Sequence, residues 1–443
     1  MSDHSSAVHS LRFKNGFTFH GPLECIIPAE LRKRENISAL TLPQPDTDPY
    51  WMLEALRESM KNAGLTNPNP AVGCILIDRN GRELARGTTQ AFPGQHAERV
   101  AFSQLNHPQL LSQGTAYLTL EPCTHYGNQP PCIDLLINSP VKRVIIARSD
   151  SDPRVSRRGI QQLQTAGKHV EVGLFQHETT AWNFAFFAGL ELKRPVFTLK
   201  WAQTLDGQLA DDTHSSKWIS GESSRAYTHW MRQRHDGILV GAQTFIQDQP
   251  QLDVRSCALR SNHHPSPIIW DLKGRLLLLP PQQQESLLKR LSSQNRKILY
   301  ITSKTQQKLL SHSIVSQKEN ILTLELTPLS DPRKNPINSE LIEKLASPEV
   351  QAFLGKKLQS IFIEGGAQTL QSFIDAGYAD SVHTFIAPMI TGGKSHRISL
   401  LKTLNEAPNF AMMGCHQLGK DTLIEMVSHP LYRKLFHSSD SKT

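Results

Sequence analysis

The chain has 443 residues, of which 38% are hydrophobic and 20% are charged. This length exceeds what one ordinary hydrophobic core needs and predicts two domains plus additional sequence, and the composition excludes wholesale disorder. Because no apolar run approaches the roughly 18 residues that a membrane-spanning helix needs, the sequence predicts no membrane partner.

The formal net charge of +8 raises the question of nucleic-acid binding. The Lys and Arg residues are spread thinly, however, and the basic blocks are as short as Arg32-Lys33-Arg34. The sequence also lacks the stripe of aromatic and basic residues that single-strand binding uses. The charge pattern therefore favours a modestly basic enzyme with phosphate-bearing small-molecule ligands and no nucleic-acid partner.

The N-terminus and the cysteines together predict a cytoplasmic protein. The first residues, MSDHSSAVHSLRFKNG, lack the apolar core of a secretory signal. The six cysteines form no disulfide framework, since only Cys123 and Cys132 lie close together in the chain. This usage fits a reducing compartment.

Residues 1–48 are a weakly patterned extension whose role the sequence does not indicate. They end in TLPQPDTDP, whose prolines and aspartates are typical of a linker. Two patterned regions follow, and LKRP near residue 190 predicts the join between them. We therefore expect a first domain over residues 49–190 and a second domain over residues 195–430.

The first region alternates predicted helices with predicted strands. A helix begins at Asp48, because apolar residues recur at helical spacing and would bury one face: Trp51, Met52, Ala55, Leu56 and Met60. A hairpin turn joins a strand over 72–77 to a returning strand over 83–87. The later patterns predict helices at 96–105, 132–137 and 160–166 and strands at 115–120, 141–147 and 169–174. This alternation predicts a layered α/β sheet.

A second α/β pattern begins at Pro195 with a strand that runs into a loop. A helix is predicted over Glu222–Arg234. Apolar strands that end in small or polar residues are predicted at 236–241, 266–272, 297–303, 360–366 and 382–388. The segment 276–355 is polar and rich in Gln and Ser, and it gives the weakest pattern.

The order of His96, Cys123 and Cys132 predicts a catalytic zinc site. Catalytic zinc takes three protein ligands and leaves a fourth position for water, and one imidazole with two thiolates satisfies this requirement. Glu98, at a predicted helix start, would face the open position without being a ligand. Zinc lowers the pKa of its water to about 7, so Glu98 can take that proton and pass it to departing ammonia. This is the H-x-E…P-C pattern of zinc nucleobase deaminases.

Each piece of this pattern is weak by itself, since a His-Ala-Glu triplet or a Pro-Cys pair arises by chance in many chains. Their order, with YLTL leading as a strand into EPC, favours the zinc site. Cys74 is the rival thiol, but it lies in an apolar strand and is expected in the core. His107 and His125 are candidates for loop or substrate contacts rather than for ligands.

The spacing of the two cysteines identifies a family. In most zinc deaminases the second and third ligands are two residues apart, whereas eight residues intervene here, in LEPCTHYGNQPPC. NPNPAVGC and HAE precede this loop, and KWAQTLDG, SKWI and EGG follow it in the second region. With these motifs, over roughly residues 50–430, the chain resembles the bifunctional deaminase/reductase family of riboflavin biosynthesis.

The resemblance implies an α/β fold of two domains, a cytidine-deaminase-like three-layer α/β/α domain and then a dihydrofolate-reductase-like α/β domain. It implies zinc-dependent hydrolytic deamination of 2,5-diamino-6-(5-phosphoribosylamino)pyrimidin-4(3H)-one, followed by NADPH reduction of the ribosyl portion to a ribityl chain. The implied cofactors are zinc (Zn2+) and NADPH. The implied assembly is a homo-oligomer, a dimer or larger.

The resemblance also assigns roles to residues at matching motif positions. In the first domain His96, Cys123 and Cys132 bind zinc, Glu98 shuttles protons, and Asn67 and His125 contact the pyrimidine or its sugar. In the second domain the NADP-contacting positions are Ala202, Trp218, Thr244, Asp248 and Gly366. The substrate-contacting positions are Ser216, Arg232, Leu252, Arg255 and Glu364, and Lys200 and Asp206 lie in the segment that lines the hydride-transfer cleft.

Residue chemistry agrees with several assignments in the second domain. Gly365 and Gly366, after a predicted strand, let backbone N–H groups approach a phosphate, although a Gly-Gly pair alone is more often a plain turn. Arg232 and Arg255 suit bidentate phosphate recognition, although each alone is typical of a surface charge. Trp218 alone is typical of a core residue. These assignments therefore rest on the order of the motifs along the chain and not on any single residue.

The sequence departs from the family pattern at several substrate-binding positions. Thr89 replaces a histidine, Asn128 a basic residue, Arg157 and His214 glycines, and Gln249 an aspartate. The loss of one charge-assisted hydrogen bond costs about 1.5–3 kcal/mol, enough to change specificity but not chemistry. Two functions stay open, the bifunctional riboflavin enzyme and a diverged paralogue with one active half or a related pyrimidine substrate.

Overall fold

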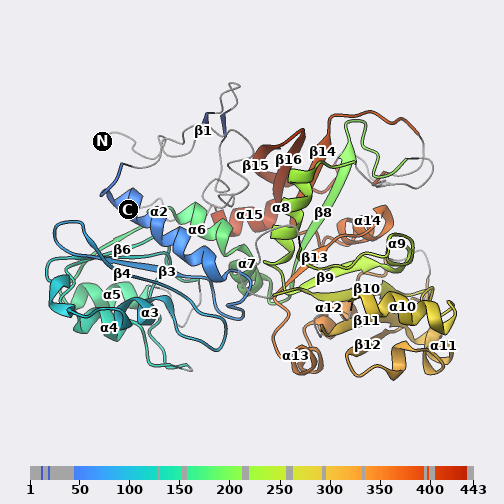
Figure 1. The fold of residues 1–443 in the computed structure, drawn as a ribbon, viewed down its shortest axis with the longest axis horizontal. Helices are drawn as coiled ribbons and strands as arrows, with labels where there is room; N and C mark the ends of the chain where they lie inside the picture. Colours follow the sequence, from blue (N-terminus) through green and yellow to red (C-terminus); the bar gives the residue numbers. More distant parts are fainter. Residues whose placement is uncertain are drawn as a thin grey trace. The chain divides into compact units, whose positions relative to one another are not determined.

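The computed structural model divides into two compact units, with the boundary between Glu191 and Leu192 (Figure 1). It describes residues 11–12, 18–19, 44–127, 129–151, 157–211, 219–255, 263–291, 296–331, 335–393, 397–398 and 405–436. Within the N-terminal extension, β1 (Leu11–Arg12) pairs antiparallel with β2 (Thr18–Phe19).

The first unit is built on a mixed sheet with the strand order β4-β3-β5-β6-β7. The strands are β3 (Gly73–Ile77), β4 (Glu83–Thr88), β5 (Thr115–Leu118), β6 (Arg143–Ile146) and β7 (His169–Val172). β3 pairs antiparallel with β4 and β5, whereas β5, β6 and β7 run parallel. The carboxyl ends of β4, β5, β6 and β7 therefore meet at one edge of the sheet.

Helices cover both faces of this sheet. On one face α2 (Asp48–Ser59) packs its residues Trp51 and Met52 against Ile75 and Tyr117 of the strands. On the other face α3 packs against β3 and β4. The remaining helices are listed by their bounds: α3 (Ala97–Ser103), α4 (Ile133–Asn138), α5 (Arg158–Thr165), α6 (Gln176–Trp182) and α7 (Phe184–Leu192).

Two glycines on neighbouring strands determine how closely α2 and α3 approach the sheet. A Cβ atom at Gly73 would lie 1.8 Å from the carbonyl oxygen of Ala55 in α2, and one at Gly87 would lie 2.1 Å from that of Ala97 in α3. Because Gly87 pairs with Cys74, the residue after Gly73, the two glycines face opposite sides of the sheet. The helices therefore flank the sheet in three layers.

The pattern predicted for this unit is confirmed. Each helix and strand predicted between residues 48 and 174 is present, with ends shifted by one or two residues. The five apolar residues of the first helical pattern are buried, and Cys74 is fully buried in the core. The sequence patterns did not reveal α6 and α7, because the apolar run FAFFAGLEL has no helical period to read.

The second unit is built on a larger sheet with the order β12-β11-β10-β9-β13-β8-β14-β16-β15. The strands are β8 (Val196–Thr204), β9 (Gly237–Gly241), β10 (Ser266–Asp271), β11 (Ile298–Ser303), β12 (Ile321–Leu326), β13 (Ser360–Ile363), β14 (Ser381–Ala387), β15 (Phe410–Leu418) and β16 (Asp421–Ser428). The strands from β12 to β14 run parallel, and β16 and β15 close the sheet antiparallel.

Helices join the parallel strands of this sheet. They are α8 (Glu222–Arg232), α9 (Ala242–Asp248), α10 (Pro281–Leu291), α11 (Gln307–Ser311), α12 (Ser339–Leu345), α13 (Pro348–Leu354) and α14 (Ala367–Asp375). A further helix, α15 (His429–Phe436), follows β16. The core is continuous from Phe197 and Leu239 in the sheet to Leu341 and Phe373 in the helices.

The helix and the strands predicted for this unit are confirmed. The two antiparallel strands at the end of its sheet, β15 and β16, were not predicted. In β16 buried and half-buried residues alternate along the whole strand, but the buried positions include Asp421 and Glu425, so the residue types do not show this alternation in the sequence. The segment 276–355, which gave the weakest pattern, contains α10 to α13 and the strands β11 and β12.

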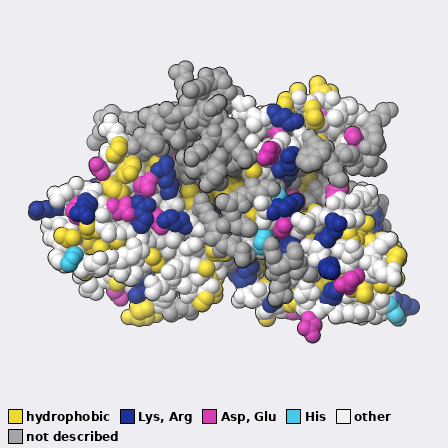
Figure 2. Space-filling view, viewed as in Figure 1, with side chains coloured by type: hydrophobic (Ala, Val, Ile, Leu, Met, Phe, Trp, Pro, Cys, Tyr) yellow, Lys and Arg dark blue, Asp and Glu magenta, His cyan; other side chains and the backbone are white. Residues whose placement is uncertain are grey.

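Within the described part of the chain, no helix is long and apolar enough to cross a membrane. On the face drawn in Figure 2, Lys and Arg side chains are interspersed with Asp and Glu side chains rather than gathered in one patch. On this face the basic side chains therefore lie among acidic ones and form no single basic patch.

A buried carboxylate ties α8 to the antiparallel end of the second sheet. Tyr227 of α8 donates its hydroxyl hydrogen to Glu425 Oε1 at 2.8 Å, and His383 Nδ1 lies 2.9 Å from the same oxygen. His416 Nε2 lies 3.2 Å from the other oxygen, and all four side chains are buried. Burial alone would raise the pKa of Glu425, but His383 and His416 hold it well below its usual value.

We expect Glu425→Gln to destabilise the folded chain by about 3 kcal/mol near neutral pH, because the variant removes the charge that the buried partners pair with. The pKa of Glu425 is lower in the folded chain than the unfolded value of about 4.3, so its stabilising contribution is complete above that pH and is lost as the pH falls. Denaturant unfolding at several pH values measures this difference.

The difference between Glu425→Gln and the original chain should shrink as the pH falls from about 7 to about 3. Glu343→Gln, on an exposed position of α12, is the matched control and should change the free energy of unfolding by less than about 0.5 kcal/mol. A loss of stability that is independent of pH would contradict the role given to the charge.

Candidate active sites

His96 stands at the carboxyl edge of the first sheet, directly before α3. Its backbone is extended, and its carbonyl oxygen accepts the N–H of Val100, a hydrogen bond that begins the helix. The loop before it is closed by the N–H of Gln90, which donates to the carbonyl oxygen of Gln95 at 2.8 Å. A Cβ atom at Gly94 would lie 2.6 Å from the Gln90 side chain, so this loop requires glycine there.

Cys123 and Cys132 lie at the two ends of a loop between β5 and α4. The loop closes on itself, because the N–H of Cys132 donates to the sulfur of Cys123 at 3.3 Å. The N–H of Ile133, the first residue of α4, donates to the carbonyl oxygen of Cys123 at 3.2 Å. The eight-residue spacer therefore brings the two thiols together rather than separating them.

Two side chains attach the same loop to the segment around His96. Arg99 Nη2 donates to the carbonyl oxygen of Pro130 at 2.9 Å, and Gln129 Nε2 donates to that of Gly94 at 3.2 Å. In the first contact α3 donates to the loop between the cysteines, and in the second that loop donates to the segment before His96. The position of the imidazole relative to the thiols is thereby fixed.

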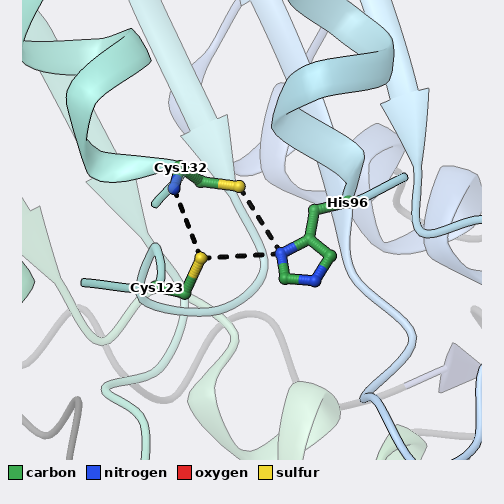
Figure 3. A group of neighbouring side chains, drawn as sticks. All are labelled: His96, Cys123 and Cys132. Atoms are coloured by element: carbon green, nitrogen blue, oxygen red, sulfur yellow. Dashed lines mark hydrogen bonds between the residues drawn. The ribbon is translucent and has the colours of Figure 1, made fainter. Parts of the chain in front are cut away.

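The three predicted ligand atoms converge on one point (Figure 3). The Nδ1 atom of His96 lies 3.6 Å from Cys123 Sγ and 3.5 Å from Cys132 Sγ. With Zn–S bonds of about 2.3 Å and Zn–N bonds of about 2.0–2.1 Å, tetrahedral zinc spaces its nitrogen and sulfur ligands by about 3.6 Å. The donor set and its spacing therefore fit zinc.

Hydrogen bonding and burial set the ionisation of this site. A hydrogen bond from Cys132, with a second from His96, stabilises the thiolate of Cys123 and lowers its pKa to about 4. Glu98 lies in the first turn of α3 and is only 4% exposed. Burial, followed by the charge of Cys123, raises the pKa of Glu98 to about 7. A carboxyl group with this pKa can both accept and deliver a proton near neutral pH.

The structure places both predicted pyrimidine-contacting residues near this edge of the sheet. Asn67 is buried in the turn before β3, and Leu65 of that turn accepts the N–H of Phe92, in the loop that leads to His96. His125 lies between the two cysteines, and its buried Nδ1 atom has no hydrogen-bond partner among the described residues. His125 therefore has an atom available for a ligand.

Thr89, which replaces a histidine of the family pattern, is built into the scaffold. It is 2% exposed, and its hydroxyl oxygen accepts the N–H of Val72 at 3.1 Å. Its carbonyl oxygen accepts Asn62 Nδ2 at 2.9 Å, so both contacts hold the turn before β3 to the end of β4. Two other departures, Asn128 and His214, lie outside the described residues.

Glu121 is a residue of this site that the sequence patterns did not reveal. Its carboxylate is 4% exposed and accepts the backbone N–H groups of Asp150, Arg157, Gly159 and Ile160 at 3.0–3.3 Å. These bonds fix the loop after β6 and the start of α5 next to the Pro-Cys segment. The sequence does place this carboxylate at the end of an apolar strand, where it is expected to be buried. A buried charge needs hydrogen-bond partners, so its position could have indicated a structural role.

A cavity of about 610 Å³ opens at the carboxyl edge of the parallel strands in the second unit. Open parallel sheets bind ligands at this edge. Seven of the predicted cofactor and substrate residues line it: Lys200, Ala202, Thr244, Asp248, Leu252, Glu364 and Gly366. Residues that are distant in the sequence therefore meet at one cavity.

A pair of buried charges forms one end of this cavity. Glu364 accepts hydrogen bonds from Arg232 Nε at 2.6 Å and Arg232 Nη2 at 2.7 Å. Burial alone would raise the pKa of Glu364, but Arg232, with Lys200, lowers it to about 2. Burial also lowers the pKa of Lys200, whose ammonium lies 5.2 Å from the ring centre of Phe385. Two cations and one carboxylate leave this end with a net positive charge.

Glycines leave room for a phosphate at the N-terminus of α14. A Cβ atom at Gly365 would lie 2.6 Å from the Thr369 Cβ, and one at Gly366 would lie 3.0 Å from Thr244 Oγ1. Backbone N–H groups at a helix start bind phosphate when no side chain covers them. The turn from β13 into α14 therefore fits the phosphates of NADPH.

Backbone strain lies next to the cavity, after α9. Gln249, which replaces an aspartate of the family pattern, has a φ of 45°, and Leu252 has a φ of 49°. Aspartate tolerates this left-handed conformation better than glutamine or leucine does. Leu252 is 1% exposed and lines the cavity, so packing holds it in this conformation.

Three predicted substrate residues do not line the cavity, and one of them, Arg232, reaches it only through Glu364, to which it donates two hydrogen bonds. Asp206 accepts the Thr204 hydroxyl at 2.5 Å and the N–H of Gly392 at 2.9 Å, so it closes a loop beside the sheet. Arg255 is exposed and forms an ion pair with Asp253. Two further predicted residues, Ser216 and Trp218, lie outside the described residues.

Two family models match the chain in the order of its two units. The cytidine and deoxycytidylate deaminase zinc-binding region matches residues 45–148, and the RibD C-terminal domain matches residues 195–424. The first span contains His96, Cys123 and Cys132, and the second contains every residue that lines the cavity. Together with the two α/β sheets, these matches confirm the predicted fold class.

Relatives match over nearly their whole length. The chain is 32% identical over 385 residues to the riboflavin biosynthesis protein RibD of Actinobacillus pleuropneumoniae, covering 86% of this chain and 95% of that protein. It is 30% identical over 396 residues to RibD of Escherichia coli strain K12, covering 86% and 99%. A solved deaminase/reductase structure from Thermotoga maritima aligns with a TM-score of 0.69 and 28% identity, covering 86% and 98%.

We expect Arg232→Met to destabilise the chain by about 3–5 kcal/mol, because it leaves Glu364 buried without its guanidinium partner. The double variant Arg232→Met/Glu364→Gln should be more stable than Arg232→Met, since it removes the unpaired charge as well. Denaturant unfolding of the original chain, both single variants and the double variant measures the coupling. Additive losses would contradict the pairing as the source of the effect.

Proposed function

Since the chain belongs to the RibD family of riboflavin biosynthesis proteins, we propose that its first unit deaminates 2,5-diamino-6-(5-phosphoribosylamino)pyrimidin-4(3H)-one and that its second unit reduces the product. The observation that carries the proposal is the convergence of His96, Cys123 and Cys132 at the spacing of tetrahedral zinc, with Glu98 buried beside them. A hydrolytic deaminase needs this set of groups.

In the proposed deamination, His96, Cys123 and Cys132 hold zinc. Zinc supplies a Lewis acid that lowers the pKa of a bound water. Glu98 accepts a proton from the attacking water and delivers it to the departing amino group, so a C–O bond forms, a C–N bond breaks and ammonia leaves. The pKa of about 7 for Glu98 supports both transfers near neutral pH.

In the proposed reduction, NADPH supplies the hydride that converts the ribosyl portion into a ribityl chain. Gly366 lies in the turn that would receive the cofactor phosphates at the start of α14, and Thr244 of α9 lines the cavity beside it. Lys200 and Glu364 line the end of the cavity that would bind the sugar phosphate, and Arg232 holds Glu364 in place there through two hydrogen bonds. Their fixed charges orient the substrate next to the cofactor.

The matches do not favour a diverged paralogue with one active half, because both units match their own family model. We also propose that residues 49–190 form the deaminase domain and residues 195–430 the reductase domain. We also propose that the chain forms a homo-oligomer, as its motifs' resemblance to the family implies. The absence of a disulfide framework among its cysteines in the sequence supports a reducing compartment, and hence a cytoplasmic location.

We expect Glu98→Gln to lower the rate of ammonia release by about 10²- to 10⁴-fold, because the amide cannot transfer the proton. The zinc content of the variant should be unchanged, since Glu98 is no zinc ligand. Its oxidation of NADPH with the deaminated substrate should also be unchanged, since Glu98 lies in the first unit and the reductase cavity in the second. Glu171→Gln, on the exposed strand β7, is the matched control and should leave ammonia release unchanged. Full activity of Glu98→Gln would contradict the assigned role.

We expect Cys123→Ser to lose bound zinc and ammonia release together, because a serine hydroxyl replaces a thiolate ligand. Metal analysis of the purified protein gives the zinc content per chain, and NADPH oxidation reports on the other unit. Cys74→Ala is the matched control, since Cys74 lies in the core of the same sheet, and it should keep its zinc. Zinc retained by Cys123→Ser and lost by Cys74→Ala would reverse the ligand assignment.

A further inference from the structure

Leu252 lines the reductase cavity in a backbone conformation that leucine rarely adopts. Its φ of 49° lies in the left-handed region, where the Cβ atom of an L-residue comes too close to a backbone carbonyl oxygen. Such a conformation persists only where the surrounding structure holds it, and strain of this kind gathers at ligand sites. The hydrogen bonds on either side of Leu252 therefore bear on the shape of the cavity.

The guanidinium of Arg296 holds the two peptide groups that flank the Cα atom of Leu252. Its Nη1 atom donates to the carbonyl oxygen of Leu252 at 2.7 Å, and its Nη2 atom donates to that of Gln251 at 2.6 Å. The dihedral angles φ and ψ of Leu252 set how these two peptide planes lie relative to each other. Because one planar fork binds both carbonyl oxygens, a rotation at Leu252 would break at least one of the two hydrogen bonds.

The next peptide group is held from α8. The carbonyl oxygen of Asp253 accepts a hydrogen bond from Arg232 Nη1 at 2.9 Å, and His229 Nδ1 lies 3.0 Å from the same oxygen. Arg232 also donates to Glu364, which lines the cavity. Three consecutive peptide groups beside the cavity are therefore bound by buried side chains, the first two by Arg296 and the third by α8.

Arg296 is itself held firmly and lies behind the cavity wall. It stands two residues before β11, is 6% exposed, and its carbonyl oxygen accepts Asn320 Nδ2 at 3.2 Å. It is not among the described residues that line the cavity. Burial lowers the pKa of Arg296 to about 10, against the opposing effect of the Asp253 carboxylate, so the guanidinium stays charged near neutral pH. Arg296 can therefore act on a ligand only through the segment that it binds.

We propose that Arg296 is a positioning residue of the reductase, whose hydrogen bonds to the carbonyl oxygens of Gln251 and Leu252 hold the Leu252 side chain where the sugar phosphate substrate binds. This inference rests on the proposed reductase function and on the substrate contact that the family resemblance assigns to Leu252. A leucine side chain offers no hydrogen bond, so it acts by shape. Without Arg296 the backbone of Leu252 would relax from its left-handed conformation, and the substrate would lose a fixed wall of the cavity.

The test compares Arg296→Met with the original full-length chain in NADPH binding, by isothermal titration, and in steady-state reduction of the deaminated product. The KM for that product should rise by about 10-fold, whereas the Kd for NADPH should change by less than about twofold. Unchanged NADPH binding also shows that the second unit is folded. Lys297→Met is the matched control, because Lys297 is an exposed neighbour that donates to the carbonyl oxygen of Phe353, and it should change neither quantity.

A double-mutant cycle measures whether Arg296 acts through Leu252. Leu252→Ala should raise the KM for the deaminated product. In that background Arg296→Met should raise the KM by less than about twofold more, because the side chain that Arg296 positions is already gone. Arg296→Lys keeps a cation beside Asp253 but lacks the planar fork, so it should raise the KM by less than Arg296→Met does.

Independent effects of the two substitutions on the KM would overturn the positioning role. A folded Arg296→Met variant that keeps the original KM, or that loses NADPH and substrate equally, would overturn it as well. Where Arg296→Met does not fold, Arg296→Lys takes its place in the same cycle, and an unchanged KM in that variant overturns the proposal. These outcomes leave the reductase proposal intact, which fails instead if the original chain neither binds NADPH nor reduces the deaminated product.

Discussion

The close approach of a helix start to the end of a strand, allowed by glycine, is the constraint on which both candidate sites depend. A Cβ atom at Gly87 would lie 2.1 Å from the α3 backbone, so glycine lets α3 start at the sheet edge and carry His96 to the thiols. A Cβ atom at Gly365 would lie 2.6 Å from Thr369, so glycine lets α14 start at the end of β13. In both units the chemical groups lie where a helix begins beside the carboxyl end of a strand.

Two buried carboxylates then acquire opposite properties from their neighbours. Glu98 lies beside the thiolate of Cys123, and its pKa rises to about 7. Glu364 is also largely buried, with 14% of its side chain exposed, yet the guanidinium of Arg232 lowers its pKa to about 2. Burial acts in the same direction on both groups, so the sign of the adjacent charge decides the outcome. The first carboxyl group can exchange a proton, and the second serves as a permanent charge.

The sequence predicted the cluster of His96, Cys123 and Cys132 because these residues lie in two short segments. His96 and Glu98 lie in one turn, and the two cysteines close one loop, so motif spacing alone identifies the donor set. The reductase cavity is assembled from four strands that are distant in the sequence, and a resemblance, not a pattern, supplied its residues. Glu121 was not found, because its role depends on backbone N–H groups from a distant segment, which a linear pattern does not contain.

Some residues that depart from the family pattern make structural contacts within the chain. The hydroxyl of Thr89 is bonded to the backbone of β3's entry turn, so it replaces an imidazole with a structural contact. Arg157 stands in place of a glycine with a φ of 59°, a conformation that costs a non-glycine residue about 1 kcal/mol. Its N–H is one of four that Glu121 accepts, and these bonds offset that strain. The exposed side chain of Arg157 is thereby held at the start of α5, beside Glu121 and the Pro-Cys segment.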